Sequence, residues 1–454
     1  MHDLCVPMAP GDDVDHEISL FMSGAKARLA AAEVLMLVLE QQRTLDEAMA
    51  LTRSFEALAG PDRGFARAMA STALRQLGQI EIGLQPFLNR PLDTATPPSR
   101  ALLIIGAAQL WLMDTPAHAG VGETVAAAKL WPRARKAAGF LNAVLRKVAA
   151  SRTAFDEAPA LSVWPDWLQA VATADLGSEK AEQLAKAQTS EPNLHLICKP
   201  DALNEIRSAF AAADIETEDL PSGVLMVPTG AVETYPLYDE GVWWVQDIAA
   251  ALPARLLEGT PEKTLVDLCA APGGKTMQLA ATGAKVYAVD RSAKRLARVA
   301  DNLARTKLAD KAILDAEDGE IWRPQKLAEK IDGVLVDAPC SALGTLRRHP
   351  EGPWIKSFED VARYPDIQKR LLSAALDLLR PGGTLVYCVC SPFSEEGVDV
   401  IHQALDARTC IRHPIQPGDV PGFEAQITDK GDLLTLPGPD FAHDAFFISR
   451  VTKV

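Results

Sequence analysis

The sequence lacks the usual marks of metal binding, disulfide bonding and membrane insertion. Its seven cysteines include no CxxC pair, and its eight histidines show no HxxxH or HxH spacing, so no structural zinc site is expected. An odd number of widely scattered cysteines argues against a disulfide framework and is typical of reduced thiols. No apolar run approaches the roughly 18–20 residues of a membrane span. We therefore expect no bound metal and no membrane contact.

The N-terminal segment also lacks a targeting signal. Residues 1–24 are acidic and polar, without the basic start and apolar core of a signal peptide. We expect this segment to be flexible and the protein to be a cytoplasmic monomer. With 454 residues, 48% hydrophobic and 23% charged, the chain has the composition of a globular protein of about two to four domains.

The net charge of −14 is unevenly placed along the chain. Residues 61–152 hold twelve Lys/Arg against five Asp/Glu, whereas residues 153–262 hold five against nineteen. Residues 129–152 carry basic side chains and no acid at all. A basic face on an acidic protein can neutralise phosphates locally, although a solvated helix surface would explain the same run.

The hydrophobic pattern divides the chain into three structured regions. Residues 25–150 place apolar side chains at helical spacing, with breaks at glycine and proline, which predicts an all-α bundle. Residues 151–240 predict a small α/β domain. Residues 241–454 alternate strand and helix patterns, as in a doubly wound α/β sheet. The elements predicted in the middle region are a helix near Leu168–Leu176, a strand over Leu194–Cys198, a helix over Ala202–Ala213 and a strand over Val224–Val227.

The third region has a regular order of predicted elements. Its apolar end, Ala445–Val451, is expected to join the sheet as a late antiparallel strand. The other strands are predicted at Thr264–Cys269, Lys285–Asp290, Ala312–Leu314, Gly333–Asp337 and Gly383–Cys388, and helices at Thr276–Thr282, Ala293–Thr306 and Ile367–Leu379.

Three strand ends in this region carry residues suited to chemistry. Hydrophobic runs lead into a glycine turn at Cys269–Thr276, into Ala338-Pro339-Cys340-Ser341, and into Val389-Cys390-Ser391. The carboxyl ends of parallel strands meet at one edge of a sheet, where ligands bind. A glycine turn for a nucleotide-like cofactor and two thiols at one edge predict covalent chemistry on a bound base.

Two phosphate-binding interpretations of the glycine turn fail. A Walker A loop needs a glycine at position 269, which is Cys269, and the dinucleotide fingerprint GxGxxG is missing. Acids follow successive strands instead: Asp290, Asp318 and Asp337. Carboxylates so placed can bind ribose hydroxyls and an adenine amino group. The pattern favours S-adenosylmethionine, which has a ribose, an adenine and a sulfonium but no phosphate.

With these motifs the chain resembles the Sun/Fmu (RsmB-type) 16S rRNA cytosine-5 methyltransferases over nearly its whole length. The residues that carry the resemblance are Asp267–Thr276, Asp337–Ser341, Arg347–Pro350, Pro381–Tyr387, Cys390-Ser391, Val245–Asp247 and Gly139–Arg146. The resemblance implies a NusB-like helical RNA-binding domain, a small α/β cap and a Rossmann-type methyltransferase domain. It implies that S-adenosylmethionine is held by Cys269, Ala270, Ala271, Pro272, Gly273, Gly274, Lys275, Asp290, Asp318 and Asp337.

The resemblance also implies roles for the thiols. Cytosine C5 attacks a methyl group only after a thiolate has added to C6. In similar enzymes the downstream cysteine, here Cys390, is the nucleophile, Cys340 assists proton removal and product release, and Asp337 pairs with the cytosine edge. DNA cytosine methyltransferases attack with a Pro-Cys thiol, so Cys340 stays open as the nucleophile.

The chain departs from the family pattern beside the nucleophile. The family usually has Thr-Cys-Ser, whereas this chain has Val389-Cys390-Ser391 and a further Cys388. Residues 388 and 390 point to the same side of an extended strand. Weaker activation of Cys390 and a contribution from Cys388 both stay open.

The expected partner is ribosomal RNA, with small-subunit rRNA favoured. The residues predicted to contact it are Lys129, Arg133, Arg135, Lys136, Arg146, Lys147, Arg347 and Arg348. Two alternatives remain: a cytosine-5 methyltransferase acting on another RNA, such as 23S rRNA or tRNA, and a noncatalytic RNA-binding chaperone. Transfer of labelled methyl groups to RNA would separate catalysis from chaperoning.

Overall fold

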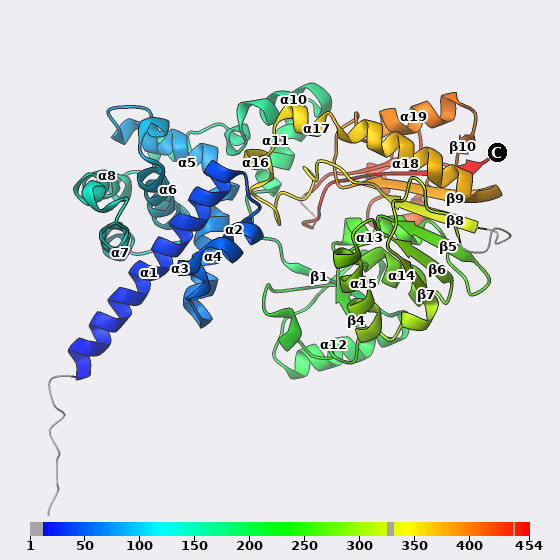
Figure 1. The fold of residues 1–454 in the computed structure, drawn as a ribbon, viewed down its shortest axis with the longest axis horizontal. Coiled ribbons are helices and arrows are strands. Elements are labelled where there is room, and N and C mark those ends of the chain that lie inside the picture. Colours follow the sequence, from blue (N-terminus) through cyan, green and yellow to red (C-terminus); the bar gives the residue numbers. More distant parts are fainter. Residues whose placement is uncertain (1–11, 325–330, 439–440) are drawn as a thin grey trace, which may run out of the picture. The chain divides into compact units, whose positions relative to one another are not determined.

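The computed structural model describes residues 12–324, 331–438 and 441–454, and for residues 12–23 the backbone alone. The chain divides into two compact units (Figure 1). The helical unit comprises the chain up to Ala170 together with His349–Ser357. The sheet unit comprises Val171–Arg348 and Phe358–Val454.

The helical unit is all-α, as predicted. Its first helix begins at Asp12, inside the segment that we expect to be flexible. Some helices have a proline at their start, as at Pro61 and Pro97, and one begins after Thr44, whose side chain and that of Glu47 form a capping box. The helices are α1 (Asp12–Gln41), α2 (Leu45–Leu51), α3 (Arg53–Glu56), α4 (Gly60–Arg75), α5 (Leu77–Leu84), α6 (Pro97–Leu112), α7 (Ala117–Leu130), α8 (Ala138–Ala150) and α9 (Thr153–Asp156), and α10 (Asp166–Leu176) runs into the sheet unit.

Helix α6 forms the centre of the helical core. Its residues from Ala101 to Ala108 are all buried, which is typical of a helix covered on every side. Gly106 permits this packing, because a Cβ there would lie 2.6 Å from the Leu145 side chain of α8. Trp111 closes the end of the helix by donating its indole hydrogen to the Val148 carbonyl, 3.1 Å away.

A short peptide from far along the sequence completes this unit. His349–Ser357 contains helix α16 (Gly352–Ile355), and Trp354 and Ile355 pack against the helical core. The Trp167 indole donates a hydrogen bond to the Pro353 carbonyl, 3.3 Å away. The sequence pattern gives no sign that this peptide belongs with helices some 200 residues earlier.

The sheet unit contains two sheets. The smaller has the order β2-β3-β1-β4, and the larger has the order β10-β12-β9-β8-β5-β6-β7, with β11 paired to β12. The strands are β1 (Leu194–Cys198), β2 (Glu218–Leu220), β3 (Val224–Val227), β4 (Trp243–Val245), β5 (Thr264–Leu268), β6 (Lys285–Val289), β7 (Ala312–Asp315), β8 (Ile331–Asp337), β9 (Leu379–Val389), β10 (Cys410–Arg412), β11 (Leu433–Thr435) and β12 (Phe446–Lys453).

The larger sheet has the predicted doubly wound form. Strands β5 to β9 pair in parallel, and β12 joins β9 antiparallel, as expected for the C-terminal stretch. Helices cover the sheet (Figure 1). Those that contact its strands are α13 (Ile248–Arg255), α14 (Gly274–Ala281), α15 (Ala293–Arg305), α18 (Tyr364–Leu378) and α19 (Val398–Asp406). Helix α12 (Leu203–Ala212) packs on the small sheet, and the unit also contains α11 (Ser178–Ala187) and α17 (Phe358–Val361).

The sequence reading missed the shortest strands, β2, β4, β10 and β11. Strand β4 pairs with β1 in the smaller sheet, with Trp243 opposite Cys198, although its residues follow the expected start of the methyltransferase domain at residue 241. Three-residue strands show too little alternation to be recognised from sequence.

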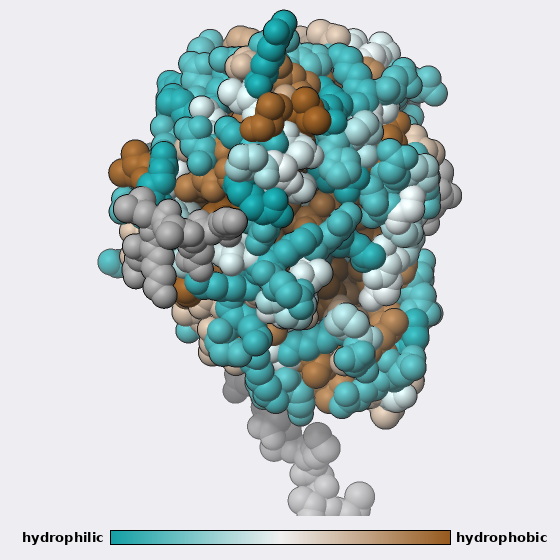
Figure 2. All heavy atoms as spheres, turned by 90° about the vertical axis from the view of Figure 1, so that its right-hand side faces the viewer, coloured by the Kyte–Doolittle hydropathy of each residue, from teal (hydrophilic) through white to brown (hydrophobic). Residues whose placement is uncertain are grey.

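The surface is polar over most of the face shown in Figure 2, and its apolar side chains form scattered patches. Among the helices of the described residues, none combines the length and apolar composition needed to cross a bilayer.

Candidate active site

The carboxyl ends of four strands converge on the candidate site. Strand β5 pairs with β6 on one side and β8 on the other, and β8 pairs with β9 so that Asp337 stands opposite Cys388. This reversal of strand order is the switch point at which open α/β sheets bind ligands. The prediction that the glycine turn and the two thiol loops meet at one sheet edge is confirmed.

The two predicted thiols touch each other. The Sγ atoms of Cys340 and Cys390 lie 3.3 Å apart, and both cysteines are free thiols. Backbone hydrogen bonds join their loops, since Ala338 N–H donates to the Cys388 carbonyl at 3.0 Å and Gly344 N–H donates to the Cys390 carbonyl at 2.9 Å. The hydrogen bond to Cys390, together with burial, raises the pKa of the Cys340 thiol well above its usual value. Cys340 therefore holds its proton.

Asp337 forms an ion pair with Lys275. The ammonium nitrogen lies 2.8 Å from Asp337 Oδ2, and the aspartate side chain is 31% exposed. Burial opposes the charge on Lys275, but the carboxylate outweighs it and raises the pKa of the ammonium group. Lys275 also lies over the Phe446 ring, 5.4 Å from its centroid. Lys275, predicted to bind the cofactor, thus stands with the predicted catalytic carboxylate.

The additional thiol, Cys388, contacts the same carboxylate. Its Sγ donates to Asp337 Oδ1 at 3.4 Å, while Lys275 contacts the other oxygen of the carboxylate. Burial and the charge of Asp337 raise the pKa of Cys388 well above its usual value, so the group stays a neutral donor. This contact places the Cys388 thiol against the predicted catalytic carboxylate.

The glycine turn is shaped for close approach of a ligand. Cys269 and Gly273 both have left-handed backbone conformations, with φ of 64° and 106°, and Gly273 caps α14. A Cβ on Gly273 would lie 3.0 Å from Val299, so this position needs glycine as well as its conformation. The turn keeps its Ala270–Lys275 backbone at the sheet edge.

A small cavity opens between the turn and the strand ends. It has a volume of about 110 Å³ and is lined by Cys269, Asp290, Asp318 and Pro339, among others. The Asp290 carboxylate is 3% exposed and accepts hydrogen bonds from Ala271 N–H at 3.3 Å and Ser292 N–H at 2.9 Å. Asp318 is exposed at the cavity. Two of the predicted acids therefore line one cavity with the turn.

Asp267, below the turn, was not singled out from the sequence as a site residue in its own right. It is fully buried; its Oδ2 accepts from the Thr276 hydroxyl at 2.6 Å, and its Oδ1 has no hydrogen-bond partner among the described residues. Burial raises the pKa of this carboxyl group to about 7. A buried carboxylate oxygen without a donor fits a cationic ligand seated on the turn.

Sequence reasoning also missed a buried polar cluster behind the thiol loops. Its members are Ser341, Gln368, Ser391 and Glu396, all fully buried. Only the positions of Ser341 and Ser391, each directly after a cysteine, could have signalled it.

The predicted RNA-binding residues fall into two groups. Lys129, Arg133, Arg135, Lys136, Arg146 and Lys147 are all exposed on α7, α8 and the turn between them. Phe140 lies among them with 45% of its surface exposed.

Arg347 and Arg348, by contrast, belong to an internal ion-pair network. Arg347 is 2% exposed and lies 3.4 Å from Asp247 and 3.3 Å from Asp444. Arg348 lies 2.8 Å from Asp247 and 3.3 Å from Asp444. A buried guanidinium held by two carboxylates is not available to a phosphate, so we leave Arg347 out of the RNA surface.

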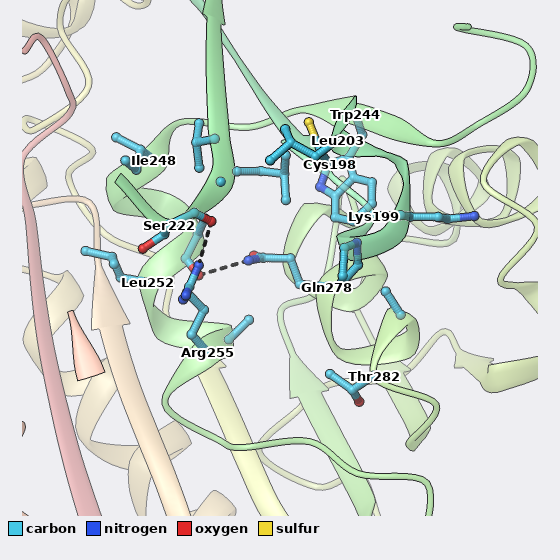
Figure 3. A pocket seen from close by; sticks show the side chains of 17 residues that line it. Cys198, Lys199, Leu203, Ser222, Trp244, Ile248, Leu252, Arg255, Gln278 and Thr282 are labelled. Carbon is cyan, nitrogen blue, oxygen red and sulfur yellow. Dashed lines mark hydrogen bonds between the residues drawn. The ribbon is translucent and has the colours of Figure 1, made fainter. Parts of the chain in front are cut away.

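A second cavity lies between the small sheet and helices α13 and α14 (Figure 3). Its volume is about 530 Å³, and no acidic side chain is among its described lining residues. The Arg255 guanidinium donates to the Ser222 carbonyl at 3.2 Å, while Lys199 points away from the other labelled side chains (Figure 3). None of the predicted site residues lines it.

Comparison with known proteins assigns both units. The model of the family 16S rRNA methyltransferase RsmB/F matches residues 254–452, and that of the NusB family matches residues 25–150. The chain is 32% identical over 446 residues to the ribosomal RNA small subunit methyltransferase B of Sodalis glossinidius, covering 94% of this chain and 97% of the relative. It is 34% identical over 446 residues to the protein of that name from Xylella fastidiosa, covering 95% and 98%.

Solved structures share the fold. The crystal structure of PH0851 covers 94% of this chain and 99% of its own, with a TM-score of 0.72 and 21% identity. NSun6 from Pyrococcus horikoshii, solved with SFG, covers 64% and 98%, with a TM-score of 0.55 and 17% identity.

Proposed function

Because the chain belongs to the RsmB/F family of 16S rRNA methyltransferases, we propose that it methylates carbon 5 of a cytidine in small-subunit rRNA through a covalent cysteine adduct. Family membership makes it an S-adenosylmethionine-dependent RNA methyltransferase with a NusB-like domain. The target atom, the base and the adduct are the proposed part. The observation that carries them is the 3.3 Å contact between the free thiols of Cys340 and Cys390 beside the Asp337–Lys275 pair.

The proposed reaction uses Cys390 as the nucleophile. Its thiolate sulfur adds to C6 of the cytosine, the C5–C6 double bond opens, and C5 becomes nucleophilic. S-adenosylmethionine supplies the methyl group that C5 then takes. Loss of the C5 proton to a base restores the double bond, and the Cys390 sulfur leaves as thiolate.

The protonated Cys340 suits product release. At 3.3 Å its S–H can donate to the Cys390 sulfur, which stabilises the thiolate before attack and again as it departs. A thiol that keeps its proton acts as a hydrogen-bond donor, because only the thiolate form is a nucleophile. We therefore give Cys340 the role of a hydrogen-bond donor to the Cys390 sulfur, which its 3.3 Å contact supports.

Asp337 and Lys275 suit the edge of the target base. A carboxylate can accept from the cytosine amino group and from a protonated ring nitrogen. An ammonium group beside it stabilises the negative charge that addition at C6 pushes toward the ring nitrogen and oxygen. We therefore assign Lys275 to the base together with Asp337, which its 2.8 Å ion pair supports.

The remaining predicted residues fit S-adenosylmethionine. Asp290 would hold the ribose and Asp318 the adenine, and the Cys269–Gly274 backbone would border the methionine part. The unpartnered oxygen of Asp267 offers a charge for the cationic cofactor. S-adenosylmethionine has no phosphate, so no phosphate site is needed. The absence of the Walker A glycine from the turn agrees with this.

We assign rRNA binding to the exposed basic segment between Lys129 and Lys147. Six exposed cations there face solvent and can neutralise phosphates, and Phe140 offers a flat apolar surface on which an unpaired base can stack.

The adduct mechanism is tested with two cysteine variants. Cys390→Ala should abolish transfer of labelled methyl groups to 16S rRNA while cofactor affinity stays nearly unchanged. Cys340→Ala should instead trap RNA on Cys390, seen as a protease-sensitive shifted band on denaturing gels. If Cys390→Ala is fully active and Cys340→Ala is inactive, Cys340 is the nucleophile.

The alternative functions have their own outcomes in the same assay. Methyl transfer to 23S rRNA or tRNA, but not 16S rRNA, would change the substrate. RNA binding without any methyl transfer by the unmodified protein would favour the noncatalytic chaperone.

A further inference from the structure

A buried carboxylate lies directly behind the thiol pair. Glu396 is fully buried, in the segment that follows Cys390-Ser391. Its Oε2 accepts from Ser341 N–H at 2.7 Å and from the Gln368 amide at 3.1 Å, and its Oε1 accepts from the Ser341 hydroxyl at 2.5 Å. All three donors are neutral, and within the described residues it forms no ion pair with a lysine, arginine or histidine.

A fully buried charge without a cationic partner is costly to a fold. Removing a carboxylate from water is strongly unfavourable, and hydrogen bonds to neutral donors offset this cost only in part. A glutamine or an apolar side chain would be the cheaper choice for packing alone. The position therefore calls for a function of the charge.

The hydrogen bonds of Glu396 hold both sides of Cys340. Ser341 follows this cysteine, and the Gln368 amide that donates to Glu396 also donates to the carbonyl of Pro339, which precedes it, at 3.0 Å. Gln368 lies on α18, so the loop is fixed against a helix of the sheet unit.

The same cluster reaches the second cysteine. The hydroxyls of Ser341 and Ser391 lie 3.3 Å apart, and Ser391 follows Cys390. The Ser341 hydroxyl lies between the Glu396 Oε1, at 2.5 Å, and the Ser391 hydroxyl, at 3.3 Å, and forms hydrogen bonds with both. A chain of hydrogen bonds thus connects Ser391, Ser341 and Glu396. The two serines directly follow the two cysteines whose thiols are in contact.

We propose that Glu396 is a positioning residue that clamps the Cys340 loop against the Cys390 loop and favours the proton of the thiol pair on Cys340. The inference rests on the two-thiol reaction proposed above and adds the group that assigns the two thiols their different roles. The hydrogen bond to Cys390, burial and the charge of Cys390 raise the pKa of Cys340 most, and the charge of Glu396 adds to them. The other titratable groups that face Cys340 are Tyr364 and Tyr387.

Glu396→Gln tests the charge at nearly constant shape. The amide oxygen can still accept from Ser341 N–H and Gln368, while its NH₂ group can donate to the Ser341 hydroxyl. With the charge gone, the pKa of Cys340 should fall, and each unit raises its thiolate fraction about tenfold at a pH below that pKa. Site-resolved alkylation of the full-length protein with iodoacetamide, followed by mass spectrometry across a pH series, measures this directly.

Methyl transfer supplies the second readout. Glu396→Gln should lower transfer about 10- to 100-fold at unchanged S-adenosylmethionine affinity, as expected when catalytic groups are misplaced. Glu396→Asp keeps the charge but moves it back by one methylene. Compared with Glu396→Gln, it should bring the pH dependence of Cys340 alkylation closer to that of the parent than it brings the rate of methyl transfer. The matched control is Glu395→Gln, which removes the exposed neighbouring charge and should change neither quantity.

Ser341→Ala provides a variant that leaves the buried charge in place. It removes the hydrogen bond between the two serine hydroxyls. It should lower methyl transfer with little change in the pH dependence of Cys340 alkylation. The proposal is overturned if Glu396→Gln leaves both Cys340 alkylation and methyl transfer unchanged, or if Glu395→Gln alters them equally. Because alkylation needs no RNA, its result stands even if the protein proves to act on another nucleic acid.

Discussion

Two basic runs, one in the helical unit and one in the sheet unit, differ in what their side chains contact. Arg133, Arg135 and Lys136 are exposed, whereas Arg347 is buried between two carboxylates and Arg348 lies beside it. Both runs are basic when read as sequence. The difference lies in Asp247 and Asp444, which come from about 100 residues away on either side. A cation is available to RNA only where the fold supplies no acid.

Arg347→Ala should have the largest effect and should act on stability. Removing one partner of a buried ion pair leaves an uncompensated charge, which typically costs about 3–5 kcal/mol of unfolding free energy. Urea denaturation measures the loss of unfolding free energy. Arg133→Ala is the exposed control and should change stability by less than about 0.5 kcal/mol. Equal losses in the two variants would contradict the difference between the buried and the exposed arginine.

Asp267→Asn should make stability less sensitive to pH. The folded-state pKa of about 7 lies above the usual aspartate value of 3.8, so the folded chain keeps a proton that the unfolded chain releases. The stability contributed by this proton is present below pH 3.8 and is lost as the pH rises through 7, at about 1.4 kcal/mol per pKa unit.

The asparagine variant should therefore gain stability relative to the parent between pH 4 and pH 8. Thermal melts without cofactor across this range measure the difference, and the exposed Asp301→Asn serves as the control. A constant difference between parent and Asp267→Asn would show that the buried carboxyl group does not titrate there.

RNA binding by the basic segment should depend on salt concentration, whereas the stability contributed by Asp267 should depend on pH. Replacing Arg133, Arg135 and Lys136 together by alanine should weaken RNA binding and lower the slope of log affinity against log salt by about two to three units, near 0.7–0.9 per lost contact. S-adenosylmethionine affinity and melting temperature should not change. An unaltered slope would reduce the segment to a solvated helix surface.

Phe140→Ala should give the smallest change. If an unpaired base stacks on this ring, binding of single-stranded RNA should fall by about 1 kcal/mol, the low end for one stacked base. The salt slope should stay the same, because no charge is lost. Leu51, 60% exposed and outside the basic segment, provides the apolar control as Leu51→Ala.

Local patterns were enough to predict the strands and helices that form the site. The hydrophobic runs before Cys269, Asp337 and Cys388 became β5, β8 and β9, because buried parallel strands require continuous apolar stretches. The meeting of Cys340 and Cys390 also followed from the parallel topology. These predictions depended on contacts between neighbouring strand ends, which sequence order implies.

Contacts between distant residues could not be predicted. Nothing local to Arg347 points to Asp247 or Asp444, and nothing local to Glu396 points to Ser341 or Gln368. The pairing of Lys275 with Asp337 was also missed. A lysine in the glycine turn can reach either the cofactor site or the end of the neighbouring strand, and the sequence does not decide between them. Partners of buried charges are fixed by the fold as a whole.

The peptide His349–Ser357 has a consequence for the way this chain can be divided. The polypeptide passes between the two units three times, after Ala170, Arg348 and Ser357, so no single cut separates them. An expression product ending at residue 170 would lack Trp354 and leave its place in the helical core open to water. A product starting at residue 171 would carry that tryptophan without its packing partners. Recombination between genes would meet the same obstacle, because exchange of the helical unit at one junction would leave its last piece behind.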